Sequence, residues 1–105
     1  MEATRYDHYI LIHLEKNTKI QTLTQFLDKC NPSVDSLIID MLDSSILDDI
    51  IVTKLLPFHF SWQKTNNSFI LVSNIRKKSL NDMISIHTLE EALDFFHMEQ
   101  LTRNI

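Results

Sequence analysis

Two short, uninterrupted apolar runs place the strongest constraint on what this chain can fold into. Residues 36–41 read SLIIDM and residues 68–73 read SFILVS, and turn-forming residues flank each run. A strand that carries apolar side chains on both of its faces has to be covered on both faces, as in the parallel sheets of α/β proteins. We therefore predict that both runs are buried central strands.

The rest of the chain alternates between strand patterns and helix patterns. Residues 6–15 are rich in β-branched and aromatic side chains and predict a strand, with a candidate short strand before it over residues 2–6 and a further strand over residues 83–87. Apolar side chains recur at helical spacing in three segments, which are residues 17–30, 47–63 and 88–101. This order predicts an α/β fold with helices packed on a mostly parallel central sheet of four or five strands that has an antiparallel edge strand.

Local sequence signals predict where the helices begin and bend. Three pairs of side chains fit or resemble capping boxes, in which a hydroxyl binds the backbone at a helix start: Thr18 with Gln21, Ser45 with Asp48, and Thr88 with Glu91. Pro57 lies inside the middle helix, where proline removes a backbone hydrogen bond and costs about 3 kcal/mol. We expect a kink there or a helix in two pieces. The buried stripe of that helix is predicted to be Leu47, Ile51, Leu55 and Phe58.

Composition narrows the possible functions. A length of 105 residues predicts a single domain over residues 1–105. Glycine is absent, which excludes the glycine-rich loops that hold phosphates in P-loop and Rossmann proteins. A net charge of −4 disfavours a nucleic-acid partner. Cys30 is the single cysteine, so no internal disulfide can form. No apolar run reaches the roughly 20 residues that cross a bilayer, and no signal-peptide core is present, so we expect a cytoplasmic protein with no membrane partner.

From Tyr9 to Phe96 the chain resembles the STAS fold of bacterial anti-sigma-factor antagonists. The motifs that carry the resemblance are SLIIDM, LDDIIVTKLL, SFILVSN and ISIHTLEEAL. Asp40 matches the aspartate that ends a strand in the family, Asn74 follows the next strand, and residues 88–93 open the last helix. The resemblance implies a STAS-like fold and a protein that acts by binding another protein.

The C-terminal run TLEEALDFFHMEQLTRNI is similar to a narrower group, the small STAS-like proteins of Bacteroidetes-type bacteria that are often associated with ribonuclease Z. That nuclease carries a His-x-His-x-Asp-His zinc motif, and this sequence has no such motif. The similarity therefore implies a ribonuclease as a possible partner, with no nuclease activity in this chain.

The segment LDSSILDD, residues 42–49, raises the question of a phosphorylated serine at a helix start. In the family an Asp-Ser-Ser-Gly motif begins eight residues after the strand aspartate, which aligns residues 48–51 with the motif and Ile50 with the modified serine. Isoleucine has no hydroxyl, so we expect no functional phosphoacceptor at that position. Ser44 and Ser45 lie earlier and are interpreted as helix caps, with phosphorylation of either serine as the alternative.

No group of residues in the sequence favours catalysis, a cofactor or a metal. No two of the five histidines are four residues apart, which is the helical spacing of a zinc site. Cys30 lies on the apolar side of the helix predicted over residues 17–30, where a cysteine packs as a small hydrophobic side chain. The neighbouring carboxylates of Asp48 and Asp49 do not face each other on a helix. We predict that the chain is not an enzyme.

The segment LLPFHFSW, residues 55–62, contains three alternating aromatic side chains that span too wide an arc of a helix to be buried together. Either Phe58 and Trp62 are core and Phe60 is partly exposed, or the segment binds a partner. We predict a non-catalytic STAS-like interaction module that binds another protein or a second copy of itself. The candidate surface consists of Asp43, Ser44, Ser45, Asp48, Asp49, Ile50, Phe58, Phe60 and Trp62. The alternatives are an anti-sigma-factor antagonist regulated by serine phosphorylation and an accessory subunit of an enzyme such as a ribonuclease.

Overall fold

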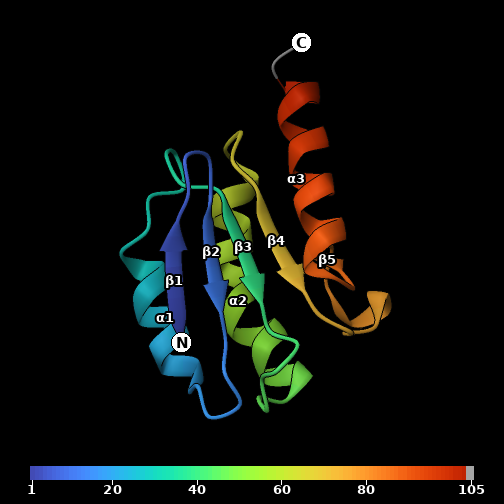
Figure 1. Cartoon of the computed structure of the whole chain (residues 1–105). Helices are drawn as coiled ribbons and strands as arrows, with labels where there is room; N and C mark the ends of the chain where they lie inside the picture. The colour runs from blue at the N-terminus through green and yellow to red at the C-terminus, as the bar shows by residue number, and fades with distance from the viewer. Residues whose placement is uncertain (104–105) are drawn as a thin grey trace.

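A computed structural model describes residues 1–103 and confirms the α/β architecture (Figure 1). Five strands alternate with three α-helices and one short 3₁₀ helix. In chain order the elements are β1 (Glu2–Arg5), β2 (Ile10–His13), α1 (Ile20–Asp28), β3 (Leu37–Asp40), α2 (Asp48–Gln63), β4 (Phe69–Val72), η1 (Lys77–Ser79), β5 (Ile84–Ile86) and α3 (Leu89–Arg103). None of the helices within residues 1–103 combines the length and the apolar character needed to cross a membrane.

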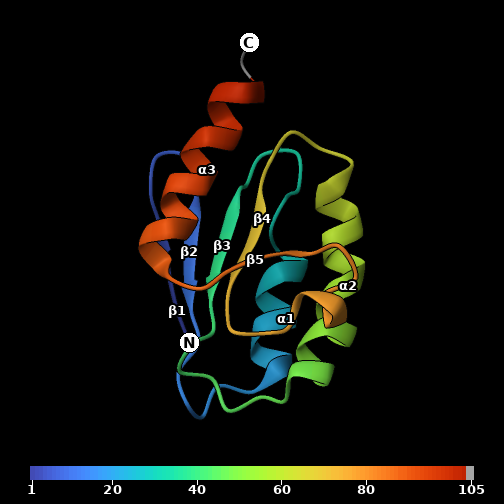
Figure 2. The same ribbon diagram turned by 90° about the vertical axis from the view of Figure 1, so that its right-hand side faces the viewer.

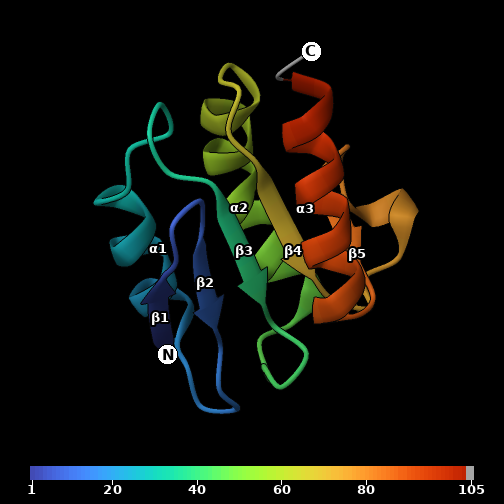
Figure 3. The ribbon, with the colours of Figure 1, turned by 45° about the horizontal axis from the view of Figure 1, so that its top comes forward.

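The five strands form one sheet whose spatial order, β1 to β5, is the order of the chain (Figure 3). Strand β1 pairs with β2 in antiparallel orientation, and the other three pairs are parallel. The predicted antiparallel edge strand is therefore confirmed. Because the parallel strands all end on the same side, the residues that follow β2, β3 and β4 meet along one edge of the sheet.

Helices cover both faces of the sheet (Figure 2). Helices α1 and α2 pack on one face over the larger apolar core, which includes Ile12, Leu37 and Leu71, while α3 packs on the other face against Ile38 and Ile70. All four residues of β4 are buried, as are the first three of β3. This confirms the prediction that both apolar runs are central strands covered on two sides.

The predicted capping boxes have different outcomes. At α3 the Thr88 hydroxyl accepts a hydrogen bond from the Glu91 backbone N–H at 3.1 Å, so this cap is confirmed. The prediction for α1 is wrong, because Thr18 Oγ1 accepts from the Glu15 backbone N–H at 2.9 Å and Lys19 takes the N-cap position without a side-chain bond. The preceding turn therefore uses the hydroxyl that the sequence assigned to the helix.

Helix α2 runs without interruption through Pro57, so the expected division into two pieces is not found. Pro57 and Thr53, four residues earlier, are both exposed. Water can therefore bind the Thr53 carbonyl that proline leaves without an N–H partner. The predicted stripe is correct for Ile51 and Leu55 and wrong for Leu47, which is 69% exposed. Leu47 is the N-cap residue, and its extended backbone turns its side chain away from the helical stripe.

Candidate functional site

A cluster of one histidine and two aspartate side chains lies where β2 and β3 end. The register of the two strands places His13 beside Asp40, and Asp43 follows in the loop that leads to α2. His13 lies between both carboxylates, with Nδ1 3.3 Å from Asp40 Oδ2 and Nε2 3.5 Å from Asp43 Oδ2. Asp40 Oδ1 also accepts from the Leu42 backbone N–H at 3.2 Å. These contacts join the ends of two strands to the loop before α2.

Ser44 and Ser45 occupy that loop and do not cap α2. The Ser44 hydroxyl accepts from the Ile46 backbone N–H at 3.1 Å, and Ser45 donates its hydroxyl to the Lys16 backbone carbonyl. The helix begins at Asp48, and its N-cap, Leu47, makes no side-chain capping bond. The predicted Ser45 cap is therefore wrong, because its hydroxyl serves the loop before α1. Neither serine lies in the first turn of α2.

The start of α2 combines exposed aliphatic and acidic side chains. Leu42, Leu47 and Ile50 are 43%, 69% and 40% exposed. Leu47 and Ile50 are joined through the first helical turn, because the Ile50 N–H donates to the Leu47 carbonyl at 3.1 Å. The acidic side chains are all exposed, and the two in the first turn suit the positive end of the helix dipole. We call this group the α2 entry surface, and its members are Leu42, Asp43, Leu47, Asp48, Asp49 and Ile50.

The aromatic residues of α2 separate into core and surface. Trp62 is 2% exposed, and its indole Nε1 donates to the Asp35 backbone carbonyl at 2.7 Å. Phe58 is half-buried against the same core, and Phe60 is half-exposed. The sequence placed all three on a candidate surface, and this is wrong for Trp62, whose side chain and N–H are both engaged inside the protein. Of the three, Phe60 presents the most surface.

The other residues considered for chemistry are dispersed. Within residues 1–103 no three histidine, cysteine, aspartate or glutamate side chains gather as metal ligands would. Cys30 is half-buried just after α1, which ends at Asp28, so its predicted position on that helix is wrong. Burial raises the pKa of its thiol, with a further contribution from the nearby Asp35 carboxylate. A raised pKa leaves less of the nucleophilic thiolate at neutral pH.

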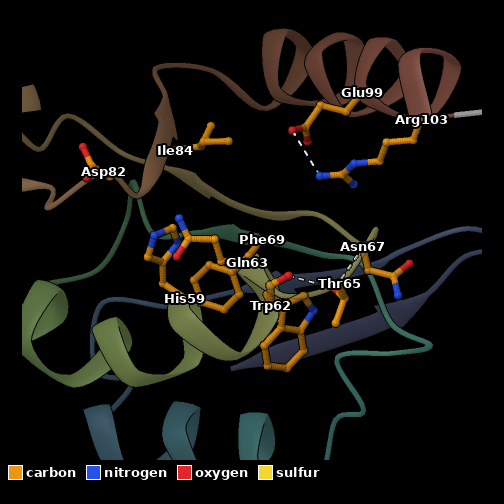
Figure 4. Close-up of a pocket in the computed structure, with 10 residues that line it drawn as sticks. All are labelled: His59, Trp62, Gln63, Thr65, Asn67, Phe69, Asp82, Ile84, Glu99 and Arg103. Carbon is orange, nitrogen blue, oxygen red and sulfur yellow. Dashed lines mark hydrogen bonds and ion pairs between the residues drawn. The ribbon is translucent and has the colours of Figure 1, made fainter.

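A cavity of about 190 Å³ with a mixed polar and apolar lining lies at the opposite edge of the sheet, between α2, the start of β5 and the end of α3 (Figure 4). His59 lines it, is 8% exposed, and has a buried Nε2 atom without a hydrogen-bond partner among the described residues. Burial lowers the pKa of this imidazole, and the Asp82 carboxylate partly opposes that shift. Sequence reasoning missed this cavity, although His59 follows Leu55 by four residues and precedes Trp62 by three, the spacing of an inward-facing side chain.

Fold and surface together define an α/β protein with a mostly parallel sheet, a mixed apolar and acidic surface at one sheet edge, and a small cavity of mixed lining at the other. No protein-family model matches this chain, and comparisons with curated proteins and with solved structures gave no match either. The arguments about function below therefore start from the geometry of this chain.

Proposed function

We propose that this protein is a non-catalytic, STAS-like interaction module that binds another protein through the α2 entry surface. The observation that carries the proposal is the exposure of Leu42, Leu47 and Ile50 in one short segment at the carboxyl edge of a parallel sheet. Aliphatic side chains that gather on a surface and are bordered by charged residues are typical of protein–protein contacts.

The charges at this surface favour a partner that carries lysine or arginine around an apolar centre. Asp43, Asp48 and Asp49 are exposed, and no lysine or arginine within residues 1–103 forms an ion pair with them. A symmetric contact with a second copy would bring identical acidic groups together, because a two-fold interface pairs the same patch on both subunits. Like charges at close range oppose such a contact. We therefore favour a different, basic protein as the partner.

The resemblance to the STAS family supports the same surface. In that family the start of the second helix carries the regulatory serine, and the α2 entry surface occupies the corresponding position here. Ile50 stands where the serine would be, and Ser44 and Ser45 both make hydrogen bonds within the loop. We infer that the interaction does not depend on a phosphorylation cycle.

Paired substitutions at two surfaces test the proposal. Leu47→Ser with Ile50→Ser removes the centre of the α2 entry surface, and Met98→Ser with Leu101→Ser is a matched control, because that pair is 68% and 69% exposed on α3 with similar spacing. Partners captured from the native host by both the natural chain and the control should be lost with the test pair. For a purified partner, isothermal titration calorimetry should show affinity at least about tenfold weaker for the test pair and unchanged for the control.

Two further measurements can contradict the proposal. If the test pair binds the purified partner as tightly as the natural chain, the α2 entry surface is not the contact. If sedimentation shows a dimer that the test pair dissociates, the partner is a second copy and the charge argument is wrong. The phosphorylation alternative has its own test: mass spectrometry after incubation with an anti-sigma-type kinase, where phosphate on Ser44 or Ser45 would support it.

A further inference from the structure

The cavity at the amino edge of the sheet has a mixed lining. Trp62 and Phe69 form an aromatic wall, with their ring centroids 5.5 Å apart, and Ile84 extends the apolar part. In Figure 4 His59 rises from α2 toward Asp82, which lies on the opposite wall just before β5. At about 190 Å³ the cavity is smaller than the roughly 300–1,000 Å³ that drug-sized ligands occupy, so a ligand would have few non-hydrogen atoms.

Several of the polar groups in the cavity already have partners. Thr65 donates its hydroxyl to the Trp62 carbonyl at 2.8 Å, and the Asn67 side-chain amide donates to the Pro32 carbonyl at 2.8 Å. Arg103 donates to the Asn66 carbonyl and to the Ser68 hydroxyl, and it pairs with Glu99 at 3.5 Å. The Arg103 charge is thereby matched by the Glu99 carboxylate. We infer that Thr65, Asn67 and Arg103 stabilise the fold at this end of the cavity and are not free to bind a ligand.

His59 and Asp82 differ from these groups. The buried His59 Nε2 atom has no hydrogen-bond partner among residues 1–103, and an unpaired polar atom in a protein interior costs free energy. No ion pair or side-chain hydrogen bond within the described part of the chain involves Asp82. Asn81 and Asp82 have φ values of 51° and 70°, a left-handed conformation that asparagine and aspartate adopt more readily than other non-glycine residues. Asp82 is itself exposed, and its side chain is among those that line the cavity.

We propose that this cavity binds a small organic ammonium compound that carries hydrogen-bond donors. The carboxylate of Asp82 accepts hydrogen bonds and matches a positive charge, and a neutral imidazole at His59 can accept a further N–H or O–H. An anion would meet the Asp82 carboxylate, and the arginine that could attract it is already paired with Glu99.

Ethanolamine is a suitable probe, because it combines an ammonium group with a hydroxyl in four non-hydrogen atoms. We expect it to shift the ring nitrogen and carbon signals of His59 in a saturable manner at pH 8, with a dissociation constant on the order of 1 mM. Two control compounds should bind at least about tenfold more weakly than ethanolamine. Ethylene glycol has the same size without the positive charge, and acetate has a negative charge in its place. Asp82→Asn should weaken ethanolamine binding by about tenfold or more.

Asp82→Asn is a conservative choice, because asparagine tolerates the left-handed backbone as well as aspartate does. Asp94→Asn is its matched control, since Asp94 is exposed on α3 and lies outside the cavity. Unchanged thermal unfolding of both variants would confirm that each remains folded. No saturable shift of the His59 signals overturns the proposal, as does equal binding of ethylene glycol, tighter binding of acetate, or an equal effect of the two substitutions.

Discussion

Replacing Trp62 by phenylalanine should destabilise the protein strongly, because two stabilising contributions are lost together. The substitution removes the indole N–H that reaches the Asp35 carbonyl at 2.7 Å in the interior. Leaving a buried acceptor without a partner costs about 1–3 kcal/mol. The smaller ring also leaves a space beside Phe69, and part of the roughly 3–5 kcal/mol measured for complete removal of a large aromatic side chain applies here.

We therefore expect the free energy of unfolding to fall by about 2–4 kcal/mol. For a domain of this size the midpoint of thermal unfolding would fall by roughly 10–20 °C. Urea titration followed by circular dichroism measures the change, and an unchanged m-value would show that the substitution altered stability and not the surface exposed on unfolding. Phe60→Leu is the matched control, because Phe60 is 50% exposed and such surface changes alter stability by about 0.5 kcal/mol or less. Equal loss of stability in the two variants would refute the assignment of Trp62 to the core and Phe60 to the surface.

Three further predictions concern titration, capping and thiol reactivity. Burial lowers the pKa of His59 in the folded state, so the unfolded chain takes up a proton first as pH falls below about 6.5, and stability should decline there. Urea titrations from pH 8 to 5 should show a smaller decline in stability for His59→Phe than for the natural chain. Identical pH profiles of the two proteins would exclude the effect. Thr88→Ala removes the cap of α3 and should lower the free energy of unfolding by about 1 kcal/mol, measured by thermal unfolding. Thr102→Ala is the control, because Thr102 is an exposed threonine near the other end of the helix and its replacement should have little effect. Burial raises the pKa of the Cys30 thiol, so its reaction with a disulfide reagent at pH 8 should be slower in the folded protein than in urea. Equal rates would contradict the burial described for Cys30.

The fold was predictable where one strand or helix pattern decided the outcome. Residues 36–41 and 68–73 contain little but apolar side chains, and burial on both faces is the arrangement that removes them from water. The cap at Thr88 was predictable because no competing backbone group takes its hydroxyl. The Thr18 hydroxyl instead accepts a hydrogen bond from the Glu15 N–H in the turn before α1, and the Ser45 hydroxyl donates to the Lys16 carbonyl in a distant loop. Sequence spacing contains no information about these partners.

The candidate sites were predictable in part. Ile50 and the three aspartates were expected on the surface and are exposed, whereas Leu47 was assigned to the core because helical periodicity was extended over a residue that is not helical. The cavity beside His59 could not be found from the sequence, because its walls come from α2, β5 and α3. Only the packing of these elements shows that the imidazole lacks a partner.

The strand order described above has a consequence for how the chain folds. Three of the four strand pairs are parallel and join residues far apart in the sequence, such as Ile10 with Leu37 and Leu37 with Phe69, a non-local arrangement that correlates with slow folding. Helix α3 comes after the whole sheet and, of the helices within residues 1–103, is the one that packs over Ile38, Ile70 and Val72. Any intermediate in which the sheet is assembled and α3 is undocked would therefore display an apolar face, and self-association at that stage would compete with productive folding.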